Sequence, residues 1–349
     1  MSSEKIAVVL FNLGGPDGPE DVQPFLQNLF SDPAIIRSPP PVRWLVSRLI
    51  SKTRAASARA NYALMGGGSP LLPETRKQAE ALEAELASRG RNARTFIAMR
   101  YWKPYAADAV REVKAWGADK VVLLPLYPQF SSTTTASSLK SWADAKGPGG
   151  VTVCCYPDPD RFIAAHARKL VAAWEAGGRP ENVRCLLSAH GLPETVVQAG
   201  DPYQWQVELT AARLKPLLPP DWEVEVCYQS RVGPLKWIGP ATDESIRKAA
   251  ADGKAILLSP VAFVSEHIET LVELDIEYRH LADALGVKTY LRAPALGIDE
   301  DFIGTLADLV EDAAGDGGND RVRSACGGRI CPADRKDCPN RRPAVTKAA

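Results

Sequence analysis

Two of the four histidines lie in stretches that could support acid–base or metal chemistry. His190 follows a short apolar run in the sequence LLSAHGLP, and His267 lies in the sequence SEHIE. A neutral imidazole accepts a proton near pH 7 and binds divalent transition metals. A lone histidine after a strand is more often structural, so the interpretation of His190 depends on which groups accompany it.

Carboxylates accompany the second histidine at regular intervals. Glu266, Glu269, Glu273 and Glu277 are spaced three, four and four residues apart. On a helix they would form one face, and a row of like charges destabilises a helix. A solvated face is the ordinary interpretation of such a row. If the row lies near His190, it could instead pass protons or a hard divalent cation.

Cysteines are the third group of interest. The chain has seven, and Cys326, Cys331 and Cys338 stand in a polar tail with almost no apolar neighbours. No secretory leader is evident, so thiols or metal ligands are expected rather than disulfides. Zinc held by these three thiols and a further ligand is one alternative, although no CxxC pair favours it. A second alternative is that the three tail cysteines are free thiols that bind no metal.

The elements that would position these groups alternate between strands and helices. Apolar runs at residues 6–11, 120–126, 183–187 and 255–259 are typical of buried parallel strands. Each half of the chain has four predicted strands with helices between them. The sequence therefore predicts an α/β fold with two similar doubly wound domains of Rossmann or flavodoxin type, each with a four-stranded parallel sheet.

The predicted domains cover residues 1–160 and 161–297, with a tail over 315–349. A final helix over 298–313 is expected to pack back on the first domain. A strand order of 2-1-3-4 puts the switch point of each sheet between its first and third strands. The loops that end there include 12–15, 127–130, 188–190 and 265–269. We therefore expect an interdomain cleft that holds His190 and the carboxylates.

Composition limits the classes of partner. Lys+Arg and Asp+Glu balance at 42 each in 349 residues, which argues against nucleic-acid binding through bulk charge. No apolar run is long enough to cross a bilayer, and a cytoplasmic location is expected. The stretch from Val42 to Ile50, with Trp44 and Leu45, fits either core packing or a lip that dips into a membrane surface.

At this point the chain closely resembles the ferrochelatase family, enzymes that insert ferrous iron into a porphyrin. The matching stretches span nearly all of residues 6–313, and together they are highly specific. They are residues 12–16, 66–70, 100–101, 127–138, 188–193, 200–203 (GDPY), 229–240, 242–245 and 265–278.

The resemblance implies a porphyrin in the interdomain cleft and insertion of Fe²⁺ to make haem, the terminal step of haem biosynthesis. His190 would be the proton acceptor or the last iron ligand, and Glu269 would support it. Glu273 and Glu277 would relay protons or cations. The implied porphyrin contacts are Leu13, Arg100, Tyr101, Ser131 and Trp237.

Some relatives bind a [2Fe-2S] cluster through tail cysteines and one internal cysteine. The resemblance thus implies Cys326, Cys331 and Cys338 as ligands, whereas Ser132 stands where animal-type relatives have the internal cysteine. Four thiolates are the usual requirement. Cys154 and Cys155 end a predicted strand and face opposite ways; we take Cys155 as the fourth ligand, with Cys154 as the alternative.

The resemblance also favours the membrane lip, and hence protoporphyrin IX as substrate and peripheral membrane association. One departure matters: Ala63 and Leu64 replace the basic residues by which relatives grip porphyrin propionates. A homodimer is a further expectation. The alternatives are coproporphyrin III as substrate, a sister chelatase that inserts cobalt or nickel into another tetrapyrrole, and a tetrapyrrole-binding protein without catalysis.

Overall fold

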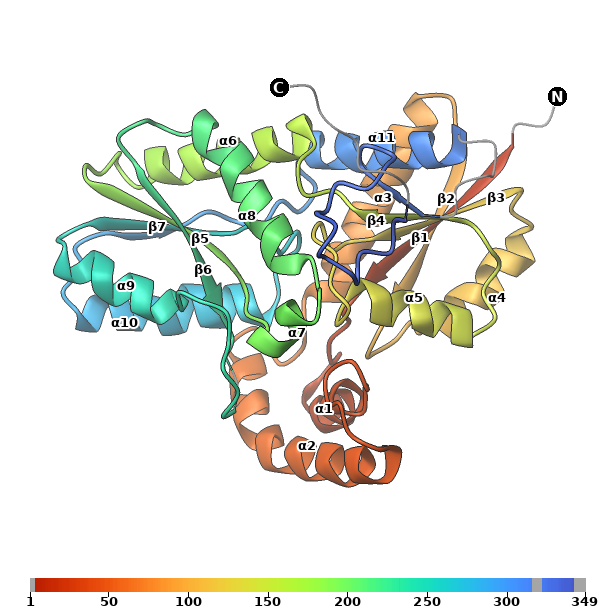
Figure 1. Ribbon diagram of the computed structural model, residues 1–349, viewed down its shortest axis with the longest axis horizontal. Helices are drawn as coiled ribbons and strands as arrows, with labels where there is room; N and C mark the ends of the chain where they lie inside the picture. Colours follow the sequence, from red (N-terminus) through yellow and green to blue (C-terminus); the bar gives the residue numbers. More distant parts are fainter. Residues whose placement is uncertain (1–3, 232, 316–321, 342–349) are drawn as a thin grey trace. The chain divides into compact units, whose positions relative to one another are not determined.

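A computed structural model describes residues 4–231, 233–315 and 322–341 (Figure 1). The described chain divides into two compact units. Unit 1 takes the residues up to 127, together with 131–154 and 307–323. Unit 2 takes residues 128–130, 155–306 and those from 324 onward. Each unit is built around a sheet, so the predicted α/β class is confirmed.

The sheet of unit 1 has the order β2-β1-β3-β4-β9. Its strands are β1 (Lys5–Asn12), β2 (Asn92–Met99), β3 (Lys120–Pro125), β4 (Val151–Cys155) and β9 (Val322–Ser324). The parallel 2-1-3-4 order of the first four strands is as predicted. The prediction of four strands is wrong for this sheet, because the tail adds β9. Three residues are too few for an alternating pattern to reveal a strand.

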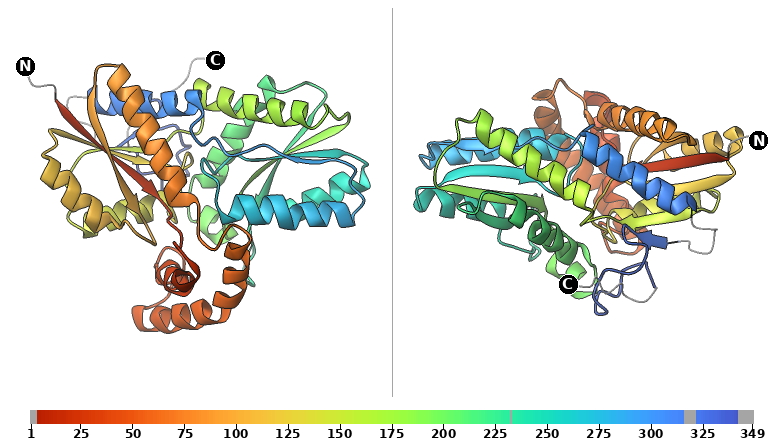
Figure 2. Two further views of the ribbon diagram at one scale, coloured as in Figure 1. Left: turned by 180° about the vertical axis from the view of Figure 1, so that it is seen from behind. Right: turned by 90° about the horizontal axis from the view of Figure 1, so that it is seen from above.

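Helices cover both faces of this sheet (Figures 1 and 2). β3 reads KVVLLP and is almost wholly buried, as expected of a strand covered on both sides. On one face, residues of β1, β2 and β3 pack with α4 and α5 in a continuous core. The helices that begin in unit 1 are α1 (Val22–Phe30), preceded by a 3₁₀ turn (Pro19–Asp21), α2 (Pro40–Ala63), α3 (Leu71–Ser88), α4 (Ala106–Trp116) and α5 (Thr135–Asp144).

The sheet of unit 2 has the order β6-β5-β7-β8 and is parallel throughout, again the predicted 2-1-3-4. Its strands are β5 (Val183–His190), β6 (Glu223–Gln229), β7 (Ala255–Pro260) and β8 (Tyr290–Arg292). The helical segments are α6 (Asp160–Ala176), α7 (Glu194–Gln198), α8 (Tyr203–Leu214), a 3₁₀ turn (Lys215–Leu217), α9 (Thr242–Ala251), a π-helix (Glu269–Glu277), α10 (Tyr278–Ala284) and α11 (Glu300–Gly315), whose last residues belong to unit 1.

Three local predictions differ from the structure. β5 does not end with the apolar run at residue 187, because the segment 188–190, predicted as a loop, continues the pairing with β6 until His190 lies opposite Gln229. The helix on which the four carboxylates were expected to form one face begins as a π-helix and becomes α-helical only at Tyr278. Helix α6 was not predicted, although Phe162, Ile163 and other buried residues line one side of it.

Helix α2 has an unusual distribution of burial. It packs against α1 beyond the carboxyl end of β1 (Figure 1), and it buries the small residues Ser47, Ser51 and Ala55. Trp44 and Leu45 are 55% and 62% exposed, and Leu49 is 62% exposed. Core packing therefore does not explain the apolar residues of this segment. Among the described residues, no helix combines the length and apolarity that a membrane crossing requires.

Candidate active site

His190 is the last residue of β5, at the carboxyl edge of the unit 2 sheet. Its Nδ1 lies 2.6 Å from the carbonyl oxygen of Gly191, which can only accept a hydrogen bond. Nδ1 therefore carries the hydrogen, and the neutral ring presents the lone pair of Nε2. This contact fixes both the tautomer and the orientation of a half-exposed imidazole.

The chain turns sharply after His190, and glycine is needed there. A Cβ on Gly191 would lie 3.0 Å from the carbonyl oxygen of Gln229 and 3.2 Å from the ring of Trp237. The Trp237 ring lies beside the imidazole, with 6.4 Å between ring centroids. Trp237 was predicted as a porphyrin contact, and the structure brings it next to His190 within unit 2.

Glu269, the first residue of the π-helix, lies between two histidines. One carboxylate oxygen is 3.6 Å from Nε2 of His190, and the other is 3.4 Å from Nε2 of His267. Burial raises the pKa of Glu269, but the two imidazoles outweigh it and hold the pKa at about 2. Glu269 is thus ionised at neutral pH. Sequence reasoning placed His267 near the row but missed that it binds Glu269.

Glu273 lies one π-helical turn further on and is enclosed by donors. Ser230 donates its backbone N–H (2.8 Å) and its hydroxyl (2.5 Å) to this carboxylate. Gln229 donates its side-chain amide (3.0 Å), and Tyr278 its hydroxyl (2.9 Å). Burial, together with the charge of Glu269, raises the pKa of Glu273 above its ordinary value. Adjacent carboxyl groups whose pKa values move apart are typical of acid–base sites.

The predicted single row of four carboxylates is only partly correct. Glu266 precedes the π-helix and accepts hydrogen bonds from Arg292 (2.9 Å) and from the backbone of Ala295 (2.8 Å). It is therefore a structural ion-pair partner. Glu277 ends the π-helix with an exposed side chain. Glu269 and Glu273 are the two that combine burial with polar contacts beside the end of β5.

The remaining predicted porphyrin contacts lie in unit 1. Leu13 is partly exposed, and Arg100 follows β2 with a partly exposed side chain. Tyr101 and Ser131 are each 1% exposed. The Tyr101 hydroxyl donates to Asp32 (2.7 Å).

Asp32 is a buried carboxylate that sequence reasoning missed. It also accepts a hydrogen bond from Nη2 of Arg100 (2.7 Å) and one from the Ser137 hydroxyl. Burial opposes ionisation, yet these hydrogen bonds lower its pKa. Asp32 thereby fixes the Arg100 side chain at the carboxyl edge of the unit 1 sheet. Because the two units are described separately, the predicted interdomain cleft stays a prediction.

Three of the predicted cluster cysteines interact within unit 2. Cys331 and Cys338 are each 1% exposed, each thiol shifts the pKa of the other, and the charge of Cys155 at the end of β4 further raises the pKa of Cys331. Cys326 is partly exposed. The contact with Cys331 lowers the pKa of Cys338, and Arg329 assists. In the part of the chain that the structure describes, no group of three or more His, Cys, Asp or Glu side chains is arranged to hold a metal ion.

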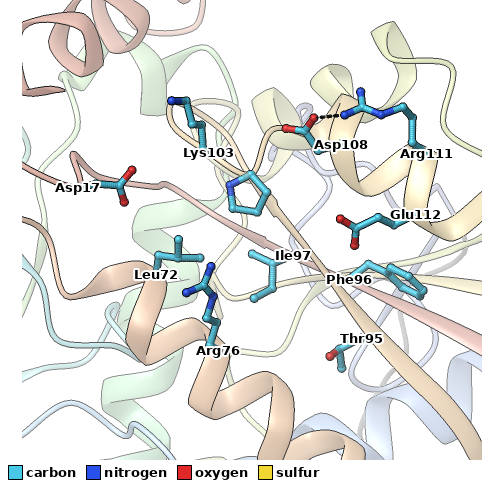
Figure 3. Close-up of a pocket in the computed structure, with 11 residues that line it drawn as sticks. Asp17, Leu72, Arg76, Thr95, Phe96, Ile97, Lys103, Asp108, Arg111 and Glu112 are labelled. Atoms are coloured by element: carbon cyan, nitrogen blue, oxygen red, sulfur yellow. Dashed lines mark hydrogen bonds and ion pairs between the residues drawn. The ribbon is translucent and has the colours of Figure 1, made fainter.

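A separate pocket of about 660 Å³ lies in unit 1 beside β2 (Figure 3). Its lining includes Arg76 from α3 and Glu112 from α4, together with Lys103. Arg111 at its rim is paired with Asp108 at 2.5 Å. None of the predicted site residues lines this pocket, so it is distinct from the carboxyl-edge residues described above.

Two doubly wound parallel sheets, with an imidazole and carboxylates at the carboxyl ends of the strands, define an α/β protein of the chelatase fold. A sirohydrochlorin chelatase from Bacillus subtilis subspecies spizizenii, solved in complex with cobalt, has a similar fold. The TM-score is 0.52 at 10% identity, and the match covers 90% of this chain and 97% of that one. An identity this low supports the fold alone.

Sequence comparison identifies the family. The ferrochelatase family model matches residues 5–314. The ferrochelatase of Hyphomonas neptunium is 59% identical over 339 residues, covering 96% of this chain and 94% of the relative. That of Caulobacter vibrioides (strain NA1000 / CB15N) is 58% identical over 343 residues, covering 97% and 98%. The chain belongs to the ferrochelatase family, whose members insert iron into a porphyrin for haem synthesis. It is therefore an enzyme, which excludes the alternative of a tetrapyrrole-binding protein without catalysis.

Proposed function

We propose that His190 accepts the pyrrole protons of the porphyrin and that Glu269 stabilises the charge that results. The observation that carries this proposal is the contact between Nε2 of His190 and an ionised carboxylate at 3.6 Å. Two lone-pair atoms at this distance repel each other unless a proton or a cation lies between them. The pair is thus suited to receive a positive charge as the reaction proceeds.

Metal insertion requires the site to remove protons from the porphyrin. A free-base porphyrin gives up two pyrrole protons, and Fe²⁺ takes their place. Nε2 of His190 accepts the two protons one after the other and passes the first toward Glu273 and water before it takes the second; Glu269 favours the imidazolium that forms each time. Glu273, with its raised pKa, exchanges protons on the far side of Glu269, and the exposed Glu277 connects it to water. The alternative is that His190 binds Fe²⁺ as its last ligand before transfer.

We propose protoporphyrin IX as the substrate, delivered from a membrane surface on which the enzyme rests at its cytoplasmic side. The support is the inverted burial of α2, with small residues inside and Trp44, Leu45 and Leu49 outside. Arg48 lies over the Trp44 ring at 5.6 Å and suits an interface with anionic lipid. Protoporphyrin carries two fewer carboxylates than coproporphyrin and is correspondingly more apolar.

An anaerobic assay with Fe²⁺ and each porphyrin in turn tests the substrate. The expected result is haem formation from protoporphyrin IX with a higher kcat/KM than metallation of coproporphyrin III. Cobalt and nickel, offered with the same porphyrins, test the sister-chelatase alternative. A higher kcat/KM for coproporphyrin III would overturn the choice of substrate while leaving the family activity intact.

We further propose that Cys155, Cys326, Cys331 and Cys338 hold a [2Fe-2S] cluster. The chemistry of the donor set fits this group: two of the thiols are buried and close enough to shift each other's pKa, and Cys155 is close enough to act on Cys331 electrostatically. Cys331 also accepts a hydrogen bond from Nε2 of Gln206 at 3.1 Å, a contact that suits a thiolate. When bound, the cluster would supply a covalent link between β4 and the tail.

Protein purified without air tests the cluster. It should be reddish, with charge-transfer absorption in the visible and about two irons per chain, the content of one [2Fe-2S] group. Cys155→Ser should lose the colour, and the matched Cys154→Ser should keep it. Colourless protein with one bound zinc would replace the cluster by the zinc alternative, and the reverse behaviour of the two variants would reassign the fourth ligand. The homodimer stays a prediction.

A further inference from the structure

A second cavity, of about 550 Å³, lies in unit 2 at the edge of its sheet. The last two turns of α6 form one wall, and the edge strand β8 forms another. Gly177 is needed where these walls meet, because a Cβ there would overlap Cδ1 of Leu291. None of the residues assigned to metal insertion lines this cavity, so the reaction described above gives it no role.

The charged residues of the cavity wall are all basic. Lys169 comes from α6, Arg279 from α10 and Arg292 from β8. Among the described residues that line the cavity, none is Asp or Glu. The whole chain has 42 basic and 42 acidic residues, so a lining with one sign of charge is a local feature of the fold. Such a lining attracts an anion.

Arg292 is held in place by the protein. Its side chain is 10% exposed, and it forms ion pairs with Glu266 at 2.9 Å and with Asp275 at 2.7 Å. These two carboxylates offset its charge. Arg292 therefore forms a fixed part of the wall, and the other two cations supply the charge that is available to a ligand.

Arg279 and Lys169 both have donors to spare. Nη1 of Arg279 donates to the carbonyl oxygen of Tyr290 at 2.9 Å, and the guanidinium lies over the Tyr290 ring at 4.9 Å. Nη2 is 3.9 Å from Oδ1 of Asp275, beyond hydrogen-bonding distance, and can donate to a ligand. Lys169 is half-buried, and within the described residues its ammonium forms no ion pair.

The rest of the lining is small and mostly apolar, with Ala172 and Ala176 of α6 on one side and Leu291 on the other. The carboxyl end of a helix repels an anion through its unpaired carbonyl oxygens. In α6 the carbonyl oxygens of residues 173–175 accept hydrogen bonds from the backbone N–H groups of residues 177–179. This pairing weakens the repulsion, and the helix end offers apolar side chains to the body of a ligand.

We infer that this cavity binds a small organic phosphate, with the phosphate on Lys169 and Arg279 and the apolar body between α6 and Leu291. A phosphate monoester carries a charge of about −1.5 to −2 at pH 7. It matches the two available cations better than the single charge of a carboxylate does. Its oxygens can accept from an ammonium and a guanidinium at once. This binding proposal does not depend on the roles of His190 and Glu269.

Arg292 connects the cavity with the segment that carries the active-site carboxylates. Its partners Glu266 and Asp275 stand on either side of Glu269 in the sequence. Arg279 also contacts this segment, because its Nε donates to the carbonyl oxygen of Asp275 at 3.2 Å. A bound phosphate competes with these contacts for both guanidinium groups. Occupancy of the cavity should therefore slow metal insertion, a consequence that rests on the proposed function of Glu269.

Isothermal titration calorimetry of the full chain with phenyl phosphate tests the site. The wild type should bind phenyl phosphate saturably and more tightly than benzoate, which has the same ring and a single charge. Lys169→Ala should raise the Kd about tenfold, as expected for loss of a hydrogen bond between charged groups. Lys248→Ala is the matched control, since Lys248 is exposed on α9 and does not line the cavity. Its Kd should equal that of the wild type.

No saturable binding by the wild type, or an equal Kd in folded Lys169→Ala, would overturn the site. Benzoate that binds as tightly as phenyl phosphate would overturn the choice of a phosphate.

The connection with the reaction has its own readout. Saturating phenyl phosphate should lower kcat for metal insertion by about fivefold, the lower end of common couplings between sites. The midpoint of this inhibition should rise in Lys169→Ala together with the Kd. An unchanged kcat, or the same midpoint in both proteins as expected if phenyl phosphate only binds iron, would overturn the connection through Arg292. Absence of metal insertion without any added anion would instead refute the proposed function.

Discussion

Glu269→Gln gives the sharpest test of the proposed chemistry, because it removes a charge and almost no volume. The carboxylate lies between His190 and His267, at 3.6 and 3.4 Å. Its pKa of about 2, against an ordinary value of 4.5, corresponds to about 3 kcal/mol of net stabilisation of the charged form. If most of this energy acts on the imidazolium formed during proton transfer, turnover should fall by a factor on the order of 10²–10³.

The assay is single-turnover metallation under anaerobic conditions, with porphyrin binding followed separately by fluorescence quenching. Glu269→Gln should bind porphyrin normally and lose rate. Glu273→Gln should lose less, because Ser230 and Tyr278 still hold the side chain. Glu181 is exposed and precedes β5, at the end of that strand opposite His190. It supplies the matched control, and Glu181→Gln should stay within twofold of wild type, as expected of a surface change. Small and equal effects at Glu269 and Glu273 would refute the reasoning and leave the row as a polar surface.

The pH dependence of stability gives a second check on the same charge. The pKa of Glu269 is lower in the folded chain than its ordinary value, so the carboxylate adds stability above pH 4.5. That contribution is lost as the pH falls from 4.5 through about 2. The melting temperature of Glu269→Gln should therefore approach that of wild type as the pH is lowered through this range. A gap that stays constant from pH 7 to pH 3 would show that the two imidazoles do not stabilise the charge.

The remaining predictions concern other parts of the two units. His190→Ala should abolish metal insertion and leave porphyrin binding largely intact; more than a tenth of wild-type turnover would contradict its role. Trp44→Ser combined with Leu45→Ser should reduce sedimentation with anionic liposomes without lowering the melting temperature, since both side chains are exposed. Asp32→Asn should break the buried pair with Arg100 and so lower the free energy of unfolding at pH 7 by about 3 kcal/mol, which a lower melting temperature would report. Because the pKa of Asp32 is lowered, this loss should shrink below pH 3.8.

Much of the architecture follows from apolar periodicity. The strands at residues 120–126 and 183–187 were predictable because buried parallel strands read as unbroken apolar runs. Their order, 2-1-3-4, follows the common arrangement of doubly wound sheets. Helix α6 was missed although Phe162, Ile163 and Leu170 form one buried side. Strand β9 could not be predicted from the sequence, because a three-residue strand in a polar tail pairs through tertiary contacts and not through its own sequence pattern.

The site was less accessible than the fold, and the reason lies in partners that are remote in sequence. Asp32 precedes Arg100 by 68 residues, and nothing local marks it as the acceptor that fixes the guanidinium. The π-helix likewise leaves no simple periodic signal, because α- and π-helical spacing both bring residues four apart to nearby positions. A uniform acidic face was therefore a reasonable expectation for residues 266–277.

Ion pairing and helix geometry together divide that face into groups with different functions. Arg292 forms an ion pair with Glu266, which gives that carboxylate a structural role. Ser230 and Tyr278 donate hydrogen bonds to Glu273. Glu269 alone lies between two imidazoles. Carboxyl groups that are regularly spaced in the sequence thus have different pKa values in the fold. A proton-transfer site requires this difference, because one carboxylate must stay charged while its neighbour more readily takes a proton. The difference in pKa between Glu269 and Glu273, rather than the number of carboxylates, is the property on which the proposed reaction depends.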